Sequence, residues 1–168
     1  MCALVLTLSV FTACNSAQPT GTDNGGSDVI DADGGDTLAD FDWIKFEMPE
    51  GYEDAKESDS YVTIQKTGDS DYMLKFFSSY IFEGETMESI VEEEGSDDYY
   101  TPGESFELGG YKWYTIHFTF NDKESSKFYT QIADKHYLQI TAFGLTEDSD
   151  EVKTVLGSVV IDQAQFED

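Results

Sequence analysis

The sequence contains no arginine, and its nine basic residues, all of them lysine, stand against 35 acidic residues. The resulting net charge is −26 at pH 7. Proteins that read nucleic acid rely on arginine for bidentate contacts with phosphate and guanine, so we expect no nucleic-acid partner. Such a surface also repels anionic lipid. Any attachment to a membrane is therefore expected to depend on something other than charge.

Cysteine and histidine are almost as scarce. The two cysteines, Cys2 and Cys14, lie at the start of the chain, which leaves the remainder without a disulfide or a thiol nucleophile. The two histidines are His117, in a predicted strand, and His136, in a predicted turn. Neither has an evident nucleophile and carboxylate partner in the sequence. We therefore predict no catalytic residue, no metal site and no cofactor, and we expect that the chain is not an enzyme.

What the chain does have is an uncharged, mainly apolar run at its start, which ends in Phe11-Thr12-Ala13-Cys14. The run is shorter than the roughly 20 residues that span a bilayer, and it has the length of a signal-peptide core. The residues before Cys14 resemble the lipobox of bacterial lipoproteins. We predict a signal peptide over residues 1–13, a lipid on Cys14, and an extracytoplasmic position at a bacterial cell membrane. A plain secretory signal and a buried N-terminal strand are the alternatives.

Residues 14–40 are rich in glycine, aspartate and serine and predict a flexible acidic tether, because they offer little apolar surface to bury. Residues 41–168 are enough for a single domain with one core. Two acidic segments carry the oxygen ligands that calcium prefers. The segment Asp31–Asp36 resembles the start of an EF-hand loop but has the wrong spacing, and Glu92–Asp98 is typical of a solvated charged surface.

The domain is predicted to consist mostly of strands. The expected helices cover Glu85–Glu94, stopped by Gly95, and the apolar stripe Val152 to Val160, which follows acidic and capping residues. The expected strands are Asp42–Met48, Tyr61–Lys66 and Tyr72–Phe82 as a hairpin, Phe106–Phe120 with a break at Gly109-Gly110, Lys127–Ala133, and Tyr137–Phe143.

The alternation of side chains predicts which residues share a face of the sheet. A three-residue loop at Asp134–His136 pairs Ala133 with Tyr137 and places even-numbered residues in the core. Extended to the preceding strand, this register puts Ile116, Phe118 and Phe120 in the core. The opposite face is then polar and aromatic, as binding surfaces often are. We predict that it binds a ligand or partner, unless a helix or loop covers it. Its candidate binding residues are Trp113, His117, Tyr129, Gln131, Tyr137 and Gln139.

The order of these elements, with the motifs Phe46-Glu47-Met48-Pro49-Glu50-Gly51-Tyr52 and Gly109-Gly110-Tyr111-Lys112-Trp113-Tyr114, resembles the PsbP-like family. The resemblance implies an α+β fold, an α/β/α sandwich in which helices flank a twisted antiparallel sheet. It also implies a binding or assembly module without a defined active site. We therefore predict a cell-envelope lipoprotein that binds an envelope protein or a small ligand. The alternative is an exported hydrolase that uses carboxylates or calcium, for which two converging carboxylates, one with a raised pKa, would be evidence.

Overall fold

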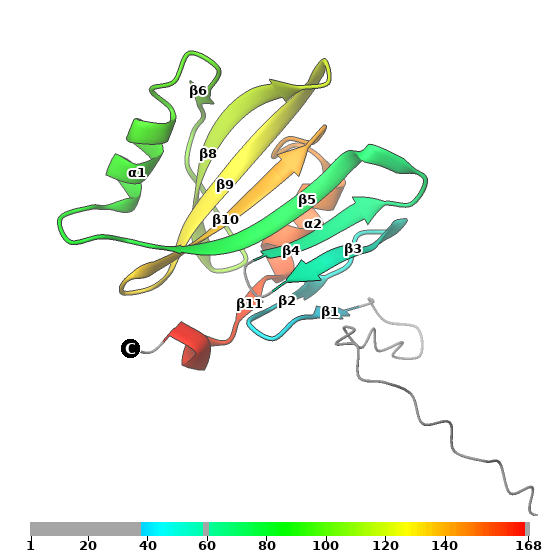
Figure 1. Ribbon diagram of the computed structural model, residues 1–168, viewed down its shortest axis with the longest axis horizontal. Coiled ribbons are helices and arrows are strands. Elements are labelled where there is room, and N and C mark those ends of the chain that lie inside the picture. The colour runs from blue at the N-terminus through cyan, green and yellow to red at the C-terminus, as the bar shows by residue number, and fades with distance from the viewer. Residues whose placement is uncertain (1–37, 59–60, 167–168) are drawn as a thin grey trace, which may run out of the picture.

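The computed structural model describes residues 38–58 and 61–166 (Figure 1). Its strands pair in antiparallel fashion and form two sheets. The large sheet has the order β3-β4-β5-β10-β9-β8-β6, and β7 pairs with β8. Its strands are β3 (Tyr52–Ser58), β4 (Tyr61–Lys66), β5 (Asp69–Tyr80), β6 (Thr101–Pro102), β7 (Phe106–Leu108), β8 (Tyr111–Phe120), β9 (Lys123–Ala133) and β10 (His136–Phe143). A small sheet contains β1 (Leu38–Asp40), β2 (Ile44–Glu47) and β11 (Val160–Ile161). With two α-helices beside the twisted large sheet, the predicted α+β class is confirmed.

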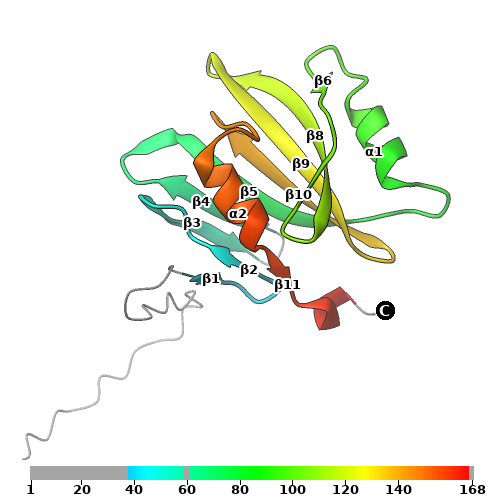
Figure 2. The same ribbon diagram turned by 180° about the vertical axis from the view of Figure 1, so that it is seen from behind.

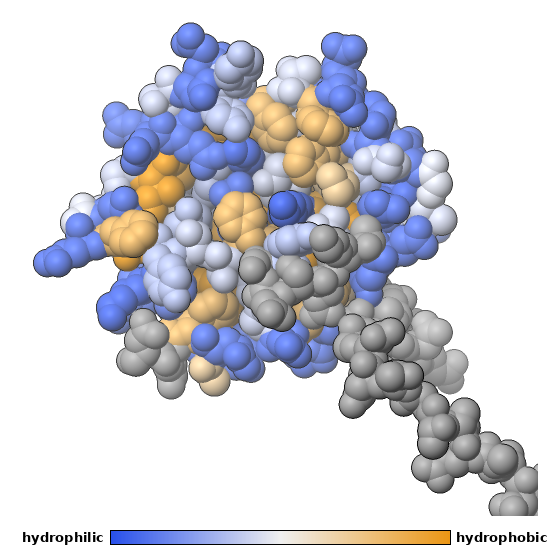
Figure 3. Space-filling model, viewed as in Figure 1, coloured by the Kyte–Doolittle hydropathy of each residue, from blue (hydrophilic) through white to orange (hydrophobic). Residues whose placement is uncertain are grey.

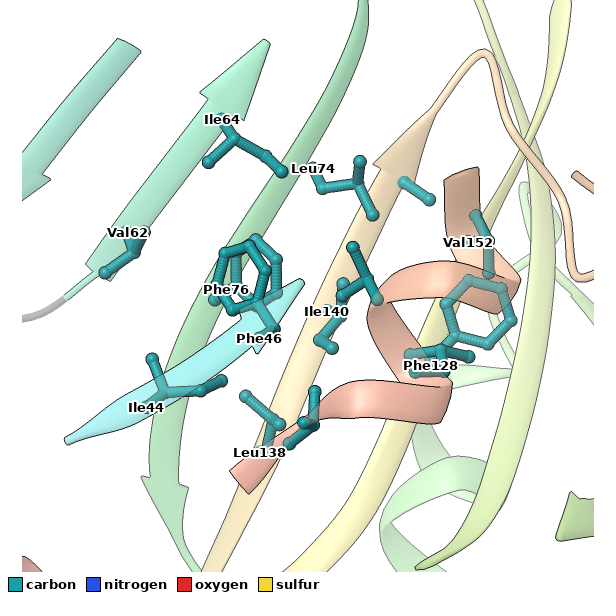
Figure 4. Packing of buried hydrophobic residues seen from close by; sticks show 14 of the residues in the cluster. Ile44, Phe46, Val62, Ile64, Leu74, Phe76, Phe128, Leu138, Ile140 and Val152 are labelled. Atoms are coloured by element: carbon teal, nitrogen blue, oxygen red, sulfur yellow. The ribbon is translucent and has the colours of Figure 1, made fainter. Parts of the chain in front are cut away.

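The helix α2 (Asp150–Ser158) lies on one face of the large sheet, as Figure 2 shows. Its buried residues Val152, Val155 and Leu156 form one stripe, and acidic residues occupy the first turn, where the helix dipole favours negative charge. The main core lies between α2, the small sheet and this face (Figure 4). Within it Phe46 of β2 stacks on Phe76 of β5, with ring centroids 4.5 Å apart.

The C-terminal helix ends earlier than its apolar stripe predicts. The Ser158 hydroxyl donates to the carbonyl of Thr154 and accepts a hydrogen bond from the Glu47 amide, which ties the end of α2 to β2. The chain then extends, so that Val160 lies in β11 opposite Lys45 of β2. The prediction that Val160 belongs to the helix is therefore wrong, and Val160 is exposed.

The helix α1 (Met87–Glu94) lies beside the β8 edge of the sheet (Figure 1). It begins at Thr86, whose side chain accepts from the Ser89 amide while the Ser89 hydroxyl accepts from the Thr86 amide. It ends at Gly95, as predicted. A short 3-10 helix, η1 (Gln163–Phe166), follows β11.

Most of the predicted N-terminal organisation, including the signal peptide 1–13 and Cys14, lies outside the described residues. The last three residues of the predicted tether, Leu38–Asp40, instead form β1, because Ala39 is buried against β2. The sequence analysis also missed β3, whose charged residues have low strand propensity.

The pairing of β8 with β9 differs from the predicted assignment of their faces. Asn121 and Asp122 have φ of 48° and 60° and form a two-residue turn that pairs Phe120 with Lys123. This pairing places odd residues of β8 beside even residues of β9. The faces predicted for β8 are therefore exchanged.

Candidate functional site

The six predicted binding residues divide between the two faces of the large sheet. Trp113 and His117 lie on the α2 side, because Thr115, which shares their face, pairs with the core residue Phe128. The other four, from β9 and β10, share the opposite face: Tyr129, Gln131, Tyr137 and Gln139. The prediction of one common face is wrong for the two β8 residues.

Trp113 is a core residue. Its side chain is fully buried, and its Nε1 donates a hydrogen bond to the Leu108 carbonyl over 3.0 Å, which joins β8 to β7. A partner cannot reach this ring in the folded protein. The prediction that Trp113 binds a ligand is therefore wrong.

His117 lies between a hydroxyl and a carboxylate. Its Nδ1 is 3.0 Å from Ser126 Oγ, and its Nε2 is 3.5 Å from Glu147 Oε1. A hydroxyl, an imidazole and a carboxylate in this order are the elements of nucleophilic catalysis. Ser126 is fully buried, however, so a substrate carbonyl cannot approach its oxygen. The contacts of His117 thus join β8 to β9 and to the segment before α2.

A hollow of about 460 Å³ adjoins His117. Two converging carboxylates, one with a raised pKa, would favour the alternative hydrolase hypothesis. Among the described carboxylates, hydrogen bonds from Lys123 and Asn121 lower the pKa of Asp71, and a hydrogen bond from Tyr114 lowers that of Glu88, but neither residue lines this hollow. The hollow is lined by Tyr99, Thr101, His117, Phe118, Thr119, Glu124, Ser125, Thr146, Glu147 and Asp148.

Tyr129 lies beneath α1 and holds this helix on the sheet. Its hydroxyl donates to Glu94 Oε2 over 2.6 Å, and Lys127 donates to the other oxygen of Glu94 and, over 2.9 Å, to the Tyr100 hydroxyl. Burial and the hydrogen bond to Glu94 raise the pKa of Tyr129 above its ordinary value. Burial opposes the charge of Lys127, but its bonds to Glu94 and Tyr100 outweigh this and raise its pKa. Tyr129 is therefore covered, and its role is structural.

Glu88, on the exposed side of α1, links this helix to β8 through hydrogen bonds. Its carboxylate accepts hydrogen bonds from the Tyr114 hydroxyl and from Lys112 Nζ, the latter over 3.3 Å. The Tyr114 hydroxyl is the main cause of a Glu88 pKa of about 2. Since folding lowers this pKa, the stabilisation is present above the unfolded value and is lost as the pH falls through about 2.

Replacing Tyr114 by phenylalanine is expected to raise the Glu88 pKa toward its ordinary value of about 4.3, because the strongest hydrogen bond to the carboxylate is removed. An NMR titration of the Glu88 side chain measures this change. Tyr111→Phe, a β8 hydroxyl substitution on a ring that packs on the main core, is the matched control and should leave the Glu88 titration unchanged. A Glu88 titration equal in wild type and Tyr114→Phe would contradict the assignment.

Of the remaining predicted residues, Gln139 is buried and donates to Thr141 Oγ1 over 3.1 Å. Gln131 is exposed, and its amide donates to the Ala133 carbonyl within the β9–β10 turn. Tyr137 is half-buried and lines a groove of about 340 Å³ between α1 and the sheet. The rings of Tyr80 and Phe82 at this groove are 58% and 70% exposed. Tyr137 is thus the predicted aromatic residue that stays accessible on this face.

The same face continues past α1 over β10, β5 and β4, where no described helix covers it (Figure 1). We call this surface the open face. Figure 3 shows apolar side chains over the ends of β9 and β10 and at its centre, among polar ones. The half-buried side chains that register places there are Tyr61, Gln65, Met73, Lys75, Phe77, Ser79, Phe118, Phe120, Tyr137 and Phe143.

Phe143 lies at the centre of a group of three phenylalanines on the open face. Its ring lies 6.0 Å from that of Phe118 and 4.8 Å from that of Phe120. The sequence analysis assigned Phe118 and Phe120 to the core, which is wrong because the Asn121-Asp122 turn reverses the faces of β8. Asn-Asp is a recognisable turn signal and could have located this surface from the sequence.

In the ranges 38–58 and 61–166, no group of three histidine, cysteine, aspartate or glutamate side chains is arranged to hold a metal ion. No helix in this part of the chain is long and apolar enough to cross a membrane.

Neither a family model nor a curated protein matches this chain. Among solved structures, a Bacteroides thetaiotaomicron protein is similar with a TM-score of 0.47 and 8% identity, over 71% of this chain but 45% of the other. The chain thus spans less than half of that protein. The solution structure of cyanobacterial PsbP (CyanoP) from Synechocystis is similar with a TM-score of 0.47 and 16% identity, over 70% of this chain and 86% of the other.

LpqN of Mycobacterium tuberculosis, described as involved in cell envelope biogenesis, is similar with a TM-score of 0.50 and 15% identity. This match covers 75% of the present chain and 84% of LpqN. The likeness to LpqN shows a common fold and, at this identity, the fold alone.

Proposed function

We propose that this chain is a binding or assembly protein of the bacterial cell envelope, held at the membrane by a lipid on Cys14, and that it docks a protein partner on the open face. The observation that carries the proposal is the half-exposed Phe143, Phe118 and Phe120 group on a part of the sheet that no described helix covers. Contiguous exposed apolar patches on soluble domains mark interaction sites. The neighbouring polar groups Gln65 and Lys75 supply hydrogen bonds at the border of such a contact.

Two further observations support the envelope location. The sequence before Cys14 has the features of a lipoprotein signal, and LpqN, which has the same fold, is involved in cell envelope biogenesis. The net charge of −26 for the full chain opposes binding to anionic lipid, so in this proposal the lipid on Cys14 supplies the membrane affinity.

Replacing Cys14 by alanine is expected to abolish membrane attachment, because two acyl chains at about 0.8 kcal/mol per buried methylene supply the binding energy. Fractionation of cells fed a labelled fatty acid measures both label and location. Cys2→Ala is the matched control and should remain labelled and membrane-bound. Label on the Cys14→Ala protein, or its full retention in the membrane fraction, would contradict the anchor.

Docking is tested by a double substitution on the open face, Phe77→Gln with Phe143→Gln. Because both rings are half-exposed, we expect the fold to persist while complexes trapped by formaldehyde in intact cells are lost. Lys153→Gln, an exposed change on α2, is the control that keeps them. Unchanged complexes in the double variant, with its thermal unfolding curve intact, would contradict docking on this face.

A further inference from the structure

Four aromatic residues line a separate hollow. It lies at the end of the molecule where the β9–β10 hairpin approaches η1, whose backbone positions Figure 1 shows. Trp43 precedes β2, Tyr80 ends β5, His136 begins β10 and Phe166 ends η1. The centroids are 6.1 Å apart for Trp43 and Phe166, 5.2 Å for Phe166 and His136, and 4.5 Å for His136 and Tyr80. The hollow of about 260 Å³ is completed by Ser78, Ser79 and Gln165.

The planes of neighbouring rings are steeply inclined to one another and do not form a flat stacking surface. Trp43 and Phe166 are inclined by 86°, Phe166 and His136 by 55°, and His136 and Tyr80 by 48°. A planar ligand needs parallel ring faces on which to stack. Rings set at these angles can instead present several faces to one compact group, as in the aromatic cages that hold quaternary ammonium ions.

The lining also selects the kind of cation. Among the described residues that line the hollow there is no aspartate, glutamate or lysine. A primary ammonium carries three N–H donors and would favour a carboxylate partner, whereas a quaternary ammonium has no donor to satisfy. A net charge of −26 raises the concentration of any cation near the surface.

We propose that the hollow bounded by Trp43, Tyr80, His136 and Phe166 binds a quaternary ammonium group of the choline type. The proposal does not rest on the open face, because no aromatic ring of that face lines the hollow, although Ser79 borders both. Its volume suits one compact group, since sites for drug-sized ligands begin at about 300 Å³.

The test is calorimetric titration of the full chain with choline and with 3,3-dimethyl-1-butanol, an uncharged molecule of the same shape. We expect choline to bind at least about tenfold more tightly, because the positive charge is what the ring faces attract. Competition by phosphatidylcholine vesicles would identify a lipid headgroup as the source, and its absence would identify a free ligand. Equal affinity for the two small molecules, or no heat from choline up to about 10 mM, would overturn the proposal.

Variants of Tyr80 test the cage itself, since this ring is 58% exposed and its loss is expected to leave the fold intact. Tyr80→Ala should weaken choline binding about tenfold, whereas Tyr80→Phe keeps a ring and should bind within about twofold of the wild type. Phe82→Ala removes an exposed ring outside the hollow and serves as the matched control. Binding that survives Tyr80→Ala unchanged, or that is lost equally in Phe82→Ala, would overturn the assignment.

Discussion

Replacing Trp113 by alanine is expected to lower the free energy of unfolding by about 3–5 kcal/mol. The ring is fully buried in the main core, and its Nε1 donates to the Leu108 carbonyl, so the substitution leaves both a cavity and an unpaired acceptor. Chemical denaturation followed by circular dichroism measures the loss.

Tyr137→Ala is the matched comparison, because this aromatic residue was predicted on the same face as Trp113 but is half-buried on the other face. We expect its effect to be less than half as large. A Trp113→Ala protein as stable as Tyr137→Ala would contradict the burial of Trp113 in the main core and, with it, the assignment of the two faces of β8.

Gly109→Ala is expected to destabilise the protein by about 2–4 kcal/mol. Gly109 has φ of +62°, where a side chain is strained, and an added Cβ would lie 2.4 Å from the Leu156 carbonyl oxygen of α2. That oxygen belongs to backbone and cannot turn away. The substitution would therefore separate the β7–β8 turn from α2 and loosen the main core.

Gly110→Ala separates the two causes of this effect. Gly110 also has positive φ, +84°, but an added Cβ would meet nothing within 4 Å. We expect a loss of about 1–2 kcal/mol from backbone strain alone. Thermal and denaturant unfolding of both variants measure the difference, and equal losses would contradict the close approach of the turn to α2.

The sequence predicted the faces of β9 and β10 correctly although it predicted the wrong pairs. Tyr137 was expected opposite Ala133 and lies opposite Gln131, a shift of two residues, which preserves the face. A β-bulge between His136 and Tyr137 produces the shift. The position of a bulge depends on how the hairpin packs, and the alternation of polar and apolar side chains does not reveal it. The pairing of β9 with β10 could therefore not be predicted from the sequence.

Only part of the candidate site was predicted, because side-chain alternation gives the face of a strand residue but does not show what covers it. Tyr137 was identified from its strand position and remains accessible beside the groove, but Tyr129 is covered by α1. The local sequence pattern of α1 did not show which part of the sheet the helix would cover. The position of α1 depends on Glu94, which lies 35 residues from Tyr129 along the chain and accepts a hydrogen bond from the Tyr129 hydroxyl. Phe118 and Phe120 of β8 were assigned to the wrong face, because the register set by the Asn121-Asp122 turn was not predicted.

Photo-crosslinking in intact cells tests the central claim, that the open face is a docking surface, most directly. A photoreactive phenylalanine analogue would replace Phe143 on the open face or, in a second strain, Lys153 on the opposite side of the molecule. We predict one recurrent protein partner from position 143 and none from position 153. Equal crosslinking from both positions, or from position 153 alone, would contradict the account.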